Sequence, residues 1–108
     1  WCLARPSAVE EFPFGTETSV FKVGGKMFAL TALDTRPLTV SLKCEPFLAE
    51  ALRAEHSAVR AGYHLNKRHW ITVTLDDSLP DELVLGLLED SYELVVDGLP
   101  KRERDLIR

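Results

Sequence analysis

The sequence predicts one α+β domain in which an antiparallel β-sheet carries helices on one face. The chain has 108 residues, of which 45% are hydrophobic and 28% charged, which suits one soluble globular domain with its own core. Strand-like runs occur at 19–30, 38–43 and 70–75, and helical spacing of apolar residues occurs at 46–52 and 83–95. Because a helix with one apolar stripe buries that stripe, we expect both helices on the same sheet face. The sequence shows no internal repeat, so residues 1–108 are expected to form a single domain.

The run SVFKVGGKMFAL, residues 19–30, predicts a β-hairpin that turns at Gly24 and Gly25. A two-residue turn of this kind needs positive φ, which glycine adopts without steric cost. Counting outward from the turn gives three facing pairs: Val23 with Lys26, Phe21 with Phe28, and Ser19 with Leu30. Before the hairpin, residues 1–8 are expected to be the end of a helix that stops near Pro6 and whose earlier turns precede Trp1.

Two further strands are predicted where apolar and polar residues alternate. One side of each strand is apolar and is expected in the core: Leu38, Val40 and Leu42, and then Ile71, Val73 and Leu75. The other side of each strand is polar or amphipathic: Thr39, Ser41 and Lys43, and then Trp70, Thr72 and Thr74. If both strands belong to one sheet, these six side chains share the face turned away from the helices.

Two helices are predicted from apolar spacing and from their end signals. The first begins at Pro46, just after Glu45, with an apolar stripe made of Phe47, Leu48, Ala51 and Leu52. The second spans about 18 residues, with Ser78 and Asp81 as a capping box and Pro80 in the first turn. Its stripe consists of Leu83, Val84, Leu87, Leu88, Leu94 and Val95, and Gly98 and Pro100 end it.

Charge is distributed unevenly along the chain. The formal net charge is −4, but residues 36–70 hold six Lys or Arg against three Asp or Glu, while residues 71–99 hold eight acids and no Lys or Arg. The acidic second helix is therefore expected to lie away from any surface made by the basic middle. No apolar run approaches the roughly 20 residues that cross a bilayer, and the N-terminal residues lack a signal-peptide pattern. We expect a cytoplasmic protein without membrane contact.

Enzyme chemistry is not indicated by the sequence. His64 and His69 are five residues apart, a spacing that suits neither two ligands on one helix face nor two on one side of a strand, so no metal is expected. Nucleophile-elbow, phosphate-loop and calcium-loop motifs are absent from the sequence. Cys2 and Cys44 lack redox or zinc spacing and are expected to be reduced. We predict a non-enzymatic protein that needs no cofactor.

The segment GYHLNKRHWITV, residues 62–73, favours binding of nucleic acid by residue type. Lys67 and Arg68 would pair with phosphates, Asn66 would read an adenine edge, and Tyr63 or Trp70 would stack on a base. A structural interpretation stays open for the same residues. In it, Lys67 and Arg68 belong to a solvated turn, Asn66 adopts the left-handed conformation, and Trp70 covers the sheet edge.

Five blocks of sequence together resemble the MmcQ/YjbR-like family of small bacterial proteins, which are usually described as DNA-binding. The resemblance spans nearly the whole chain, and its blocks are FPFG at 12–15, FKVGGKMFAL at 21–30, LKCEP at 42–46, GYHLNKRHWITV at 62–73 and LPDELVLGLLEDSYELV at 79–95. This chain departs from the family pattern at Ala61, where a proline is frequent, and at Asp77, where a glycine is frequent. These departures concern local turns.

The resemblance implies a compact α+β fold similar to frataxin-like and secretion-chaperone-like sheets, with projecting hairpins likened to a double-wing DNA-binding motif. The implied nucleic-acid surface consists of Tyr63, His64, Asn66, Lys67, Arg68, His69 and Trp70, with Lys22, Lys26 and Lys43 as further phosphate contacts. The hairpin register places Lys22 and Lys26 on opposite faces, which restricts a shared flat patch. The alternative is a protein-binding or small-molecule-binding module that uses the polar sheet face around Trp70.

Overall fold

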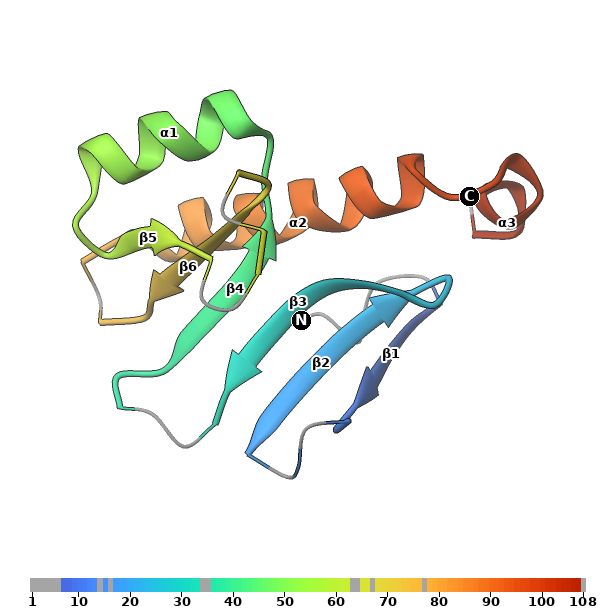
Figure 1. Cartoon of the computed structure of the whole chain (residues 1–108), viewed down its shortest axis with the longest axis horizontal. Helices are drawn as coiled ribbons and strands as arrows, with labels where there is room; N and C mark the ends of the chain where they lie inside the picture. The colour runs from blue at the N-terminus through green and yellow to red at the C-terminus, as the bar shows by residue number, and fades with distance from the viewer. Residues whose placement is uncertain are drawn as a thin grey trace.

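The structure, a computed structural model, describes residues 7–13, 15, 17–33, 36–62, 65–66, 68–76 and 78–107. Within these ranges the chain forms one six-stranded antiparallel sheet in the order β1-β2-β3-β4-β6-β5, together with three helices (Figure 1). The strands are β1 (Ala8–Glu11), β2 (Thr18–Val23), β3 (Lys26–Ala32), β4 (Thr39–Lys43), β5 (Val59–Ala61) and β6 (Trp70–Thr74). The helices are α1 (Pro46–Glu55), α2 (Asp81–Asp97) and α3 (Lys101–Ile107).

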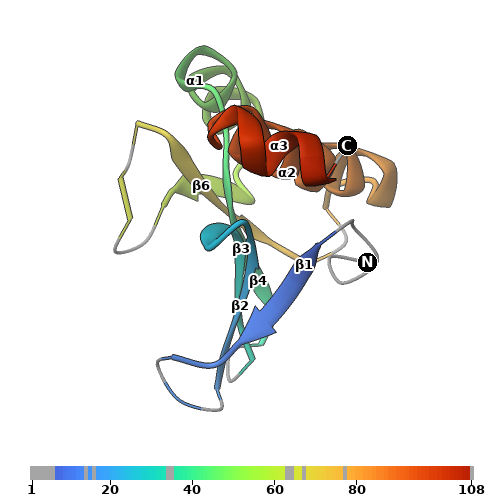
Figure 2. The ribbon, with the colours of Figure 1, turned by 90° about the vertical axis from the view of Figure 1, so that its right-hand side faces the viewer.

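Helices α1 and α2 cover the same face of the sheet. Helix α2 packs on β3 and β4 and reaches β2, while α1 packs on β5 and β6. Figure 2 shows the helices together at the top of the view, with most of the sheet below them. The core between the layers includes Phe28, Leu42 and Ile71 from the strands and Leu87 and Val96 from α2. The predicted α+β class, with helices on one face of an antiparallel sheet, is confirmed.

The hairpin turns at the predicted glycines, but its register differs from the prediction. Gly24 and Gly25 have φ of +58° and +77°, and Val23 faces Lys26 as expected. Beyond Lys22 the register shifts by one residue, so Phe21 faces Ala29 rather than Phe28, and Ser19 faces Thr31 rather than Leu30. A β-bulge at Phe28 causes the shift, since one extra residue of β3 opposes β2.

The bulge turns Phe28 toward α2. Its ring meets the ring of Tyr92 nearly edge to face, with centroids 5.4 Å apart, and lies 6.5 Å from the ring of Phe21. Ser91, fully buried on α2, donates a hydrogen bond from Oγ to the Phe28 carbonyl oxygen at 2.6 Å. The same Oγ accepts the backbone N–H of Lys43 at 2.8 Å, so one hydroxyl ties α2 to both β3 and β4.

Helix α1 buries a different stripe from the one predicted. Ala49 and Leu52 are its buried residues, whereas Phe47 is 87% exposed, Leu48 is 39% exposed and Ala51 faces solvent. The prediction of a stripe from Phe47 to Leu52 is therefore wrong except at Leu52. The physical reason is that α1 covers only the edge strand β5 and its neighbour β6, so a narrow contact with three-residue spacing is enough.

The start of α2 also differs from the prediction. Pro80 is the N-cap and no side chain caps the helix, so Ser78 and Asp81 form no capping box. Instead the Asp76 carboxylate accepts the Ser78 backbone N–H at 3.1 Å, which forms a turn before the helix. Acidic residues do occupy the first turn of α2, and Gly98 ends the helix as expected.

Three elements were not predicted, namely β1, β5 and α3. Ser7 lies in a turn with φ of 60° and β1 begins at Ala8, so the helix expected over residues 1–8 does not extend to its last two residues. The rest of that prediction, residues 1–6, lies outside the described residues.

Gly24 lies close to the segment between α2 and α3, because a Cβ added there would stand 2.7 Å from a methyl carbon of Leu99. None of the helices in the described ranges combines the length and the apolar character that a membrane span requires.

Candidate functional site

Strands β4, β5 and β6 present one polar surface on the side of the sheet turned away from α1 and α2. Directly paired residues of antiparallel strands point to the same side, and the register pairs Thr39 with Thr74, Ser41 with Thr72, Lys43 with Trp70, and Arg60 with Thr72. We call these seven residues, from Thr39 of β4 to Thr74 of β6, the polar sheet face. The predicted sharing of one face by the six residues of β4 and β6 is confirmed, and Arg60 of β5 is an addition.

Two hydroxyls in the middle of the polar sheet face are structural. Ser41 Oγ and Thr72 Oγ1 lie 2.8 Å apart in a hydrogen bond, and both residues are buried. Buried hydroxyls are ordinarily hydrogen-bonded, and this pair satisfies that need internally. The longer side chains of the face are Lys43, Arg60 and Trp70, and the paired hydroxyls lie between them.

The charges of the domain are separated between its two sides. Of the seven residues of the polar sheet face, Lys43 and Arg60 are cationic and none is acidic. Helix α2 carries six acids and packs on the opposite side of β4, but Lys43, the last residue of β4, lines a cavity with three of them, Asp90, Glu93 and Asp97. In the part of the chain that the structure describes, neither Lys43 nor Arg60 is held in an ion pair.

The two hairpin lysines differ in position. Lys22 is on the same side of the sheet as the polar sheet face, but its Nζ lies 3.0 Å from a carboxylate oxygen of Glu11. Lys26 pairs with Val23, whose side chain is in the core, so Lys26 is directed to the other side at the hairpin tip. Their predicted placement on opposite faces is confirmed, and neither extends the polar sheet face as a free cation.

Asn66 organises the segment that leads into β6. Its side-chain Oδ1 accepts the backbone N–H groups of Arg68 and His69 at 2.9 and 3.3 Å, which makes an Asx turn. Among the described residues the only non-glycine with positive φ is Ser7, so the left-handed conformation expected for Asn66 is wrong. Because Oδ1 is engaged in the turn, it is not available to accept a hydrogen bond from an adenine edge.

The segment is joined to β4 as well. The Cys44 backbone N–H donates to the His69 carbonyl oxygen at 2.8 Å, and the Gly62 N–H donates to the Trp70 carbonyl oxygen at 2.9 Å. Arg68 and His69 are exposed beside this junction. Tyr63, His64 and Lys67, which the sequence assigned to the same site, lie outside the described residues.

A surface depression of about 470 Å³ lies beside this segment and contains residues that the sequence did not assign to a site. Its lining residues are Glu45, Pro46, Phe47, Glu50 and Arg68. Phe47 was expected in the core. In the sequence, its one link to the site is that it follows Lys43 by four residues. Arg60 carried only a weak signal in the sequence, since Val59-Arg60-Ala61 alternates apolar and charged residues over just three positions.

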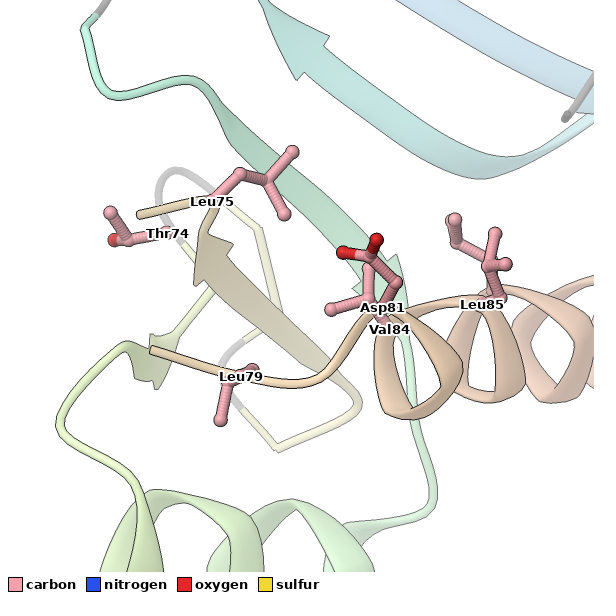
Figure 3. Close-up of a pocket in the computed structure, with 7 residues that line it drawn as sticks. Thr74, Leu75, Leu79, Asp81, Val84 and Leu85 are labelled. Atoms are coloured by element: carbon pink, nitrogen blue, oxygen red, sulfur yellow. The ribbon is translucent and has the colours of Figure 1, made fainter. Parts of the chain in front are cut away.

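Two other cavities lie along α2. One, of about 380 Å³, is largely apolar and is lined by Thr74, Leu75, Leu79, Asp81, Val84, Leu85 and Leu88. Figure 3 shows Asp81 between Leu75 and Leu85 at the beginning of the helix. The other, of about 330 Å³, lies between α1 and α2, and its lining includes Leu48, Lys43 and three α2 acids.

The Cys44 thiol is held in its protonated form. Burial raises its pKa above the ordinary value, and the nearby negative charges of Asp90 and Glu45 raise it further. A thiolate is the reactive form of cysteine, so the surroundings of Cys44 oppose a role as nucleophile.

Comparison with known proteins places this geometry in a family. A family model described as YjbR matches residues 3–94. The chain is 43% identical over 108 residues to the uncharacterized protein YjbR of Escherichia coli strain K12, covering 99% of this chain and 91% of that protein. It is 38% identical over 97 residues to the uncharacterized protein YbdF of Escherichia coli O157:H7, covering 90% of this chain and 80% of that one.

Solved structures show the same relationship. The crystal structure of the Deinococcus radiodurans protein DR2400, described as a DUF419 domain, matches with a TM-score of 0.93 and 47% identity over 98% of this chain and 81% of that one. A Pseudomonas syringae protein matches with a TM-score of 0.71 and 29% identity over 82% of this chain and 86% of that one. With a family match over most of its length and close relatives in both sequence and structure, this chain belongs to the YjbR family.

Proposed function

We propose that this protein binds nucleic acid in the cytoplasm, without catalysis, through the polar sheet face and the adjoining segment 65–70. The observation that carries the proposal is the separation of charge across the sheet. Arg60 and Trp70 lie on one side and the six acids of α2 on the other, while Lys43, at the end of β4, shares a cavity with three of those acids. A local cationic surface with an aromatic side chain is the pattern that recognises a phosphate backbone with its bases.

The net charge of −4 does not oppose this arrangement strongly. At physiological ionic strength, charges more than about 8 Å apart through solvent are largely screened. The α2 acids lie behind the sheet, so a phosphate at the polar sheet face interacts chiefly with Lys43, Arg60 and the exposed Arg68. The negative net charge of the protein then lowers its nonspecific affinity for DNA, while the polar sheet face can still bind phosphates.

The residues have different roles under this proposal. Lys43, Arg60 and Arg68 contact phosphates, while Trp70 supplies an aromatic surface, and Asn66 holds the turn that presents Arg68. Tyr63, His64, Lys67 and His69 extend the surface as the family resemblance implies. Lys22 contributes only after its ion pair with Glu11 opens, and Lys26 contributes little because it lies on the other side.

Fluorescence anisotropy with labelled random duplex DNA tests the proposal. At low salt we expect measurable binding, with log affinity falling linearly against log salt at a slope of about −0.9 per phosphate contacted. Two or three contacts predict a slope of about −2 to −3. Lys43→Glu with Arg60→Glu should weaken binding more than about tenfold, because two attractive charges become repulsive.

The matched control is Lys26→Glu with Lys101→Glu, which changes net charge equally but lies away from the polar sheet face. It should retain most of the affinity. Folded protein that fails to bind DNA at low salt would refute the proposal. Binding that the control pair weakens as much as the face pair would refute the assigned surface. Failure to bind DNA would favour the protein-binding or small-molecule-binding alternative around Trp70.

A further inference from the structure

We infer that the site accepts unpaired nucleotides, with Phe47 as the surface on which a base stacks. This inference rests on the proposed function and specifies the form of nucleic acid that it concerns. Phe47 is 87% exposed at the start of α1, the highest value among the exposed large apolar side chains of the described residues. The buried stripe of α1, Ala49 and Leu52, directs Phe47 away from the core, so packing does not account for it.

Phe47 is not an isolated aromatic residue. Strand β4 ends at Lys43, which pairs with Trp70, and α1 begins three residues later. The Cys44 N–H binds the His69 carbonyl oxygen, which fixes segment 68–70 against the β4–α1 connection. This connection places Phe47 and Arg68 in one depression, next to the end of β4 where Lys43 pairs with Trp70.

The depression that Phe47 and Arg68 line has a size suited to a base. Its volume of about 470 Å³ falls within the range of roughly 300–1,000 Å³ typical of small-ligand sites. Pro46 gives it a second apolar wall beside the Phe47 ring. A base that stacks on Phe47 would leave its phosphate toward Arg68.

An exposed aromatic ring discriminates between single and double strands. In a duplex, neighbouring bases cover one another, so a side chain on the protein surface reaches their faces only after unstacking. Single strands offer these faces directly, and stacking on aromatic residues is a common basis of their recognition. Loss of one stacking contact corresponds to a change in Kd of roughly 5- to 150-fold.

Glu45 and Glu50 add a chemical preference. Both line the depression with Phe47, and carboxylates there repel phosphate while accepting hydrogen bonds from exocyclic amino groups. Carboxylate side chains accept from the N4 amino group of cytosine, whereas thymine offers no amino group. The depression should therefore favour cytosine over thymine.

Anisotropy with labelled oligo-dC and oligo-dT of about 12 nucleotides, against a duplex of equal length, tests the inference. We expect the single strands to bind more tightly than the duplex, and oligo-dC more tightly than oligo-dT. Phe47→Ala should weaken single-strand binding about tenfold and change duplex binding less than about twofold. Because Phe47 is exposed, this variant keeps the core. Leu106→Ala, which removes another apolar side chain that is 82% exposed, is the matched control and should change neither affinity.

The outcomes separate the inference from the proposed function. Salt-dependent binding that is unaffected by Phe47→Ala, or reduced equally for duplex and single strand, overturns the inference and leaves the proposed function standing. Absence of any binding at low salt overturns both. Glu50→Gln should reduce the ratio of oligo-dC to oligo-dT affinity; a rise in both affinities at an unchanged ratio would show that Glu50 only repels phosphate and would overturn the cytosine preference.

Discussion

Replacing Ser91 with alanine should destabilise the domain far more than the loss of one oxygen atom suggests. The Ser91 hydroxyl donates to the Phe28 carbonyl oxygen at 2.6 Å and accepts the Lys43 backbone N–H at 2.8 Å, and the residue has no solvent exposure. Phe28 has no paired residue at the bulge, and the pairing of β3 with β4 ends at Ala29 and Leu42, so we assign Ser91 as the partner of both backbone groups. Alanine would leave both groups unsatisfied.

The expected cost follows from those two groups. An unsatisfied buried polar group costs about 1–3 kcal/mol. The Phe28 carbonyl lies in the core, whereas the Lys43 N–H is only partly buried and is expected at the lower end of that range. We therefore expect Ser91→Ala to lower the free energy of unfolding by about 2–4 kcal/mol.

Urea unfolding followed by circular dichroism measures this loss, with Ser57→Ala as the control because Ser57 is exposed. The control should change stability by less than about 0.5 kcal/mol. Amide hydrogen exchange adds a local readout, since the Lys43 N–H should exchange faster in Ser91→Ala than its neighbours along β4. A loss below about 1 kcal/mol, or an unchanged Lys43 exchange rate, would refute the role assigned to Ser91.

Three further predictions test the packing of the domain. Leu52→Ala should lower the free energy of unfolding by about 2–5 kcal/mol, because Leu52 is 6% exposed. Phe47→Ala should change this free energy by less than about 0.5 kcal/mol. Similar losses for both variants in urea unfolding would contradict the observed orientation of α1, in which Leu52 is buried and Phe47 exposed. Gly25→Ala should cost about 1–2 kcal/mol from positive φ alone, and Gly24→Ala about 1–3 kcal/mol more because its Cβ meets a side chain at 2.7 Å; equal melting temperatures would argue against that contact. In a Cys2→Ser background, iodoacetamide at pH 8 should modify Cys44 at least about tenfold more slowly in the folded than in the urea-unfolded protein, and mass spectrometry showing equal rates would contradict its burial. Since the pKa of Cys44 is raised on folding from the ordinary 9.0, its contribution to stability is present below pH 9 and decreases as pH rises above it.

The strands that the sequence predicted well are those with strict alternation. Strands β4 and β6 bury one side and leave the other polar, so their pattern specified both the elements and the face that each side chain occupies. Strands β1 and β5 have only four and three residues, too few for a period to be visible. The bulge at Phe28 has no local signature either, because Phe28 is held by Tyr92 and Ser91, more than sixty residues later.

The candidate site was only partly predictable for a related reason. That Lys43 and Trp70 share one face was predicted from two alternating strands in one sheet, whereas their direct pairing is seen only in the structure. Phe47 was assigned to the core because helical spacing identifies apolar residues without showing which of two adjacent stripes meets the sheet. The turn at Asn66 had the right residue type, but its hydrogen bonds show that its carbonyl oxygen supports Arg68 and His69.

The most direct test of the proposed function is an NMR titration of labelled protein with a short DNA oligonucleotide at low salt. It reports which amide and indole groups the ligand perturbs. We expect shifts concentrated at Lys43, Arg60, Arg68 and Trp70 and at the start of α1, with the amides of α2 changing little. Shifts spread along α2, or none at saturating DNA, would contradict the assignment of nucleic-acid binding to the polar sheet face.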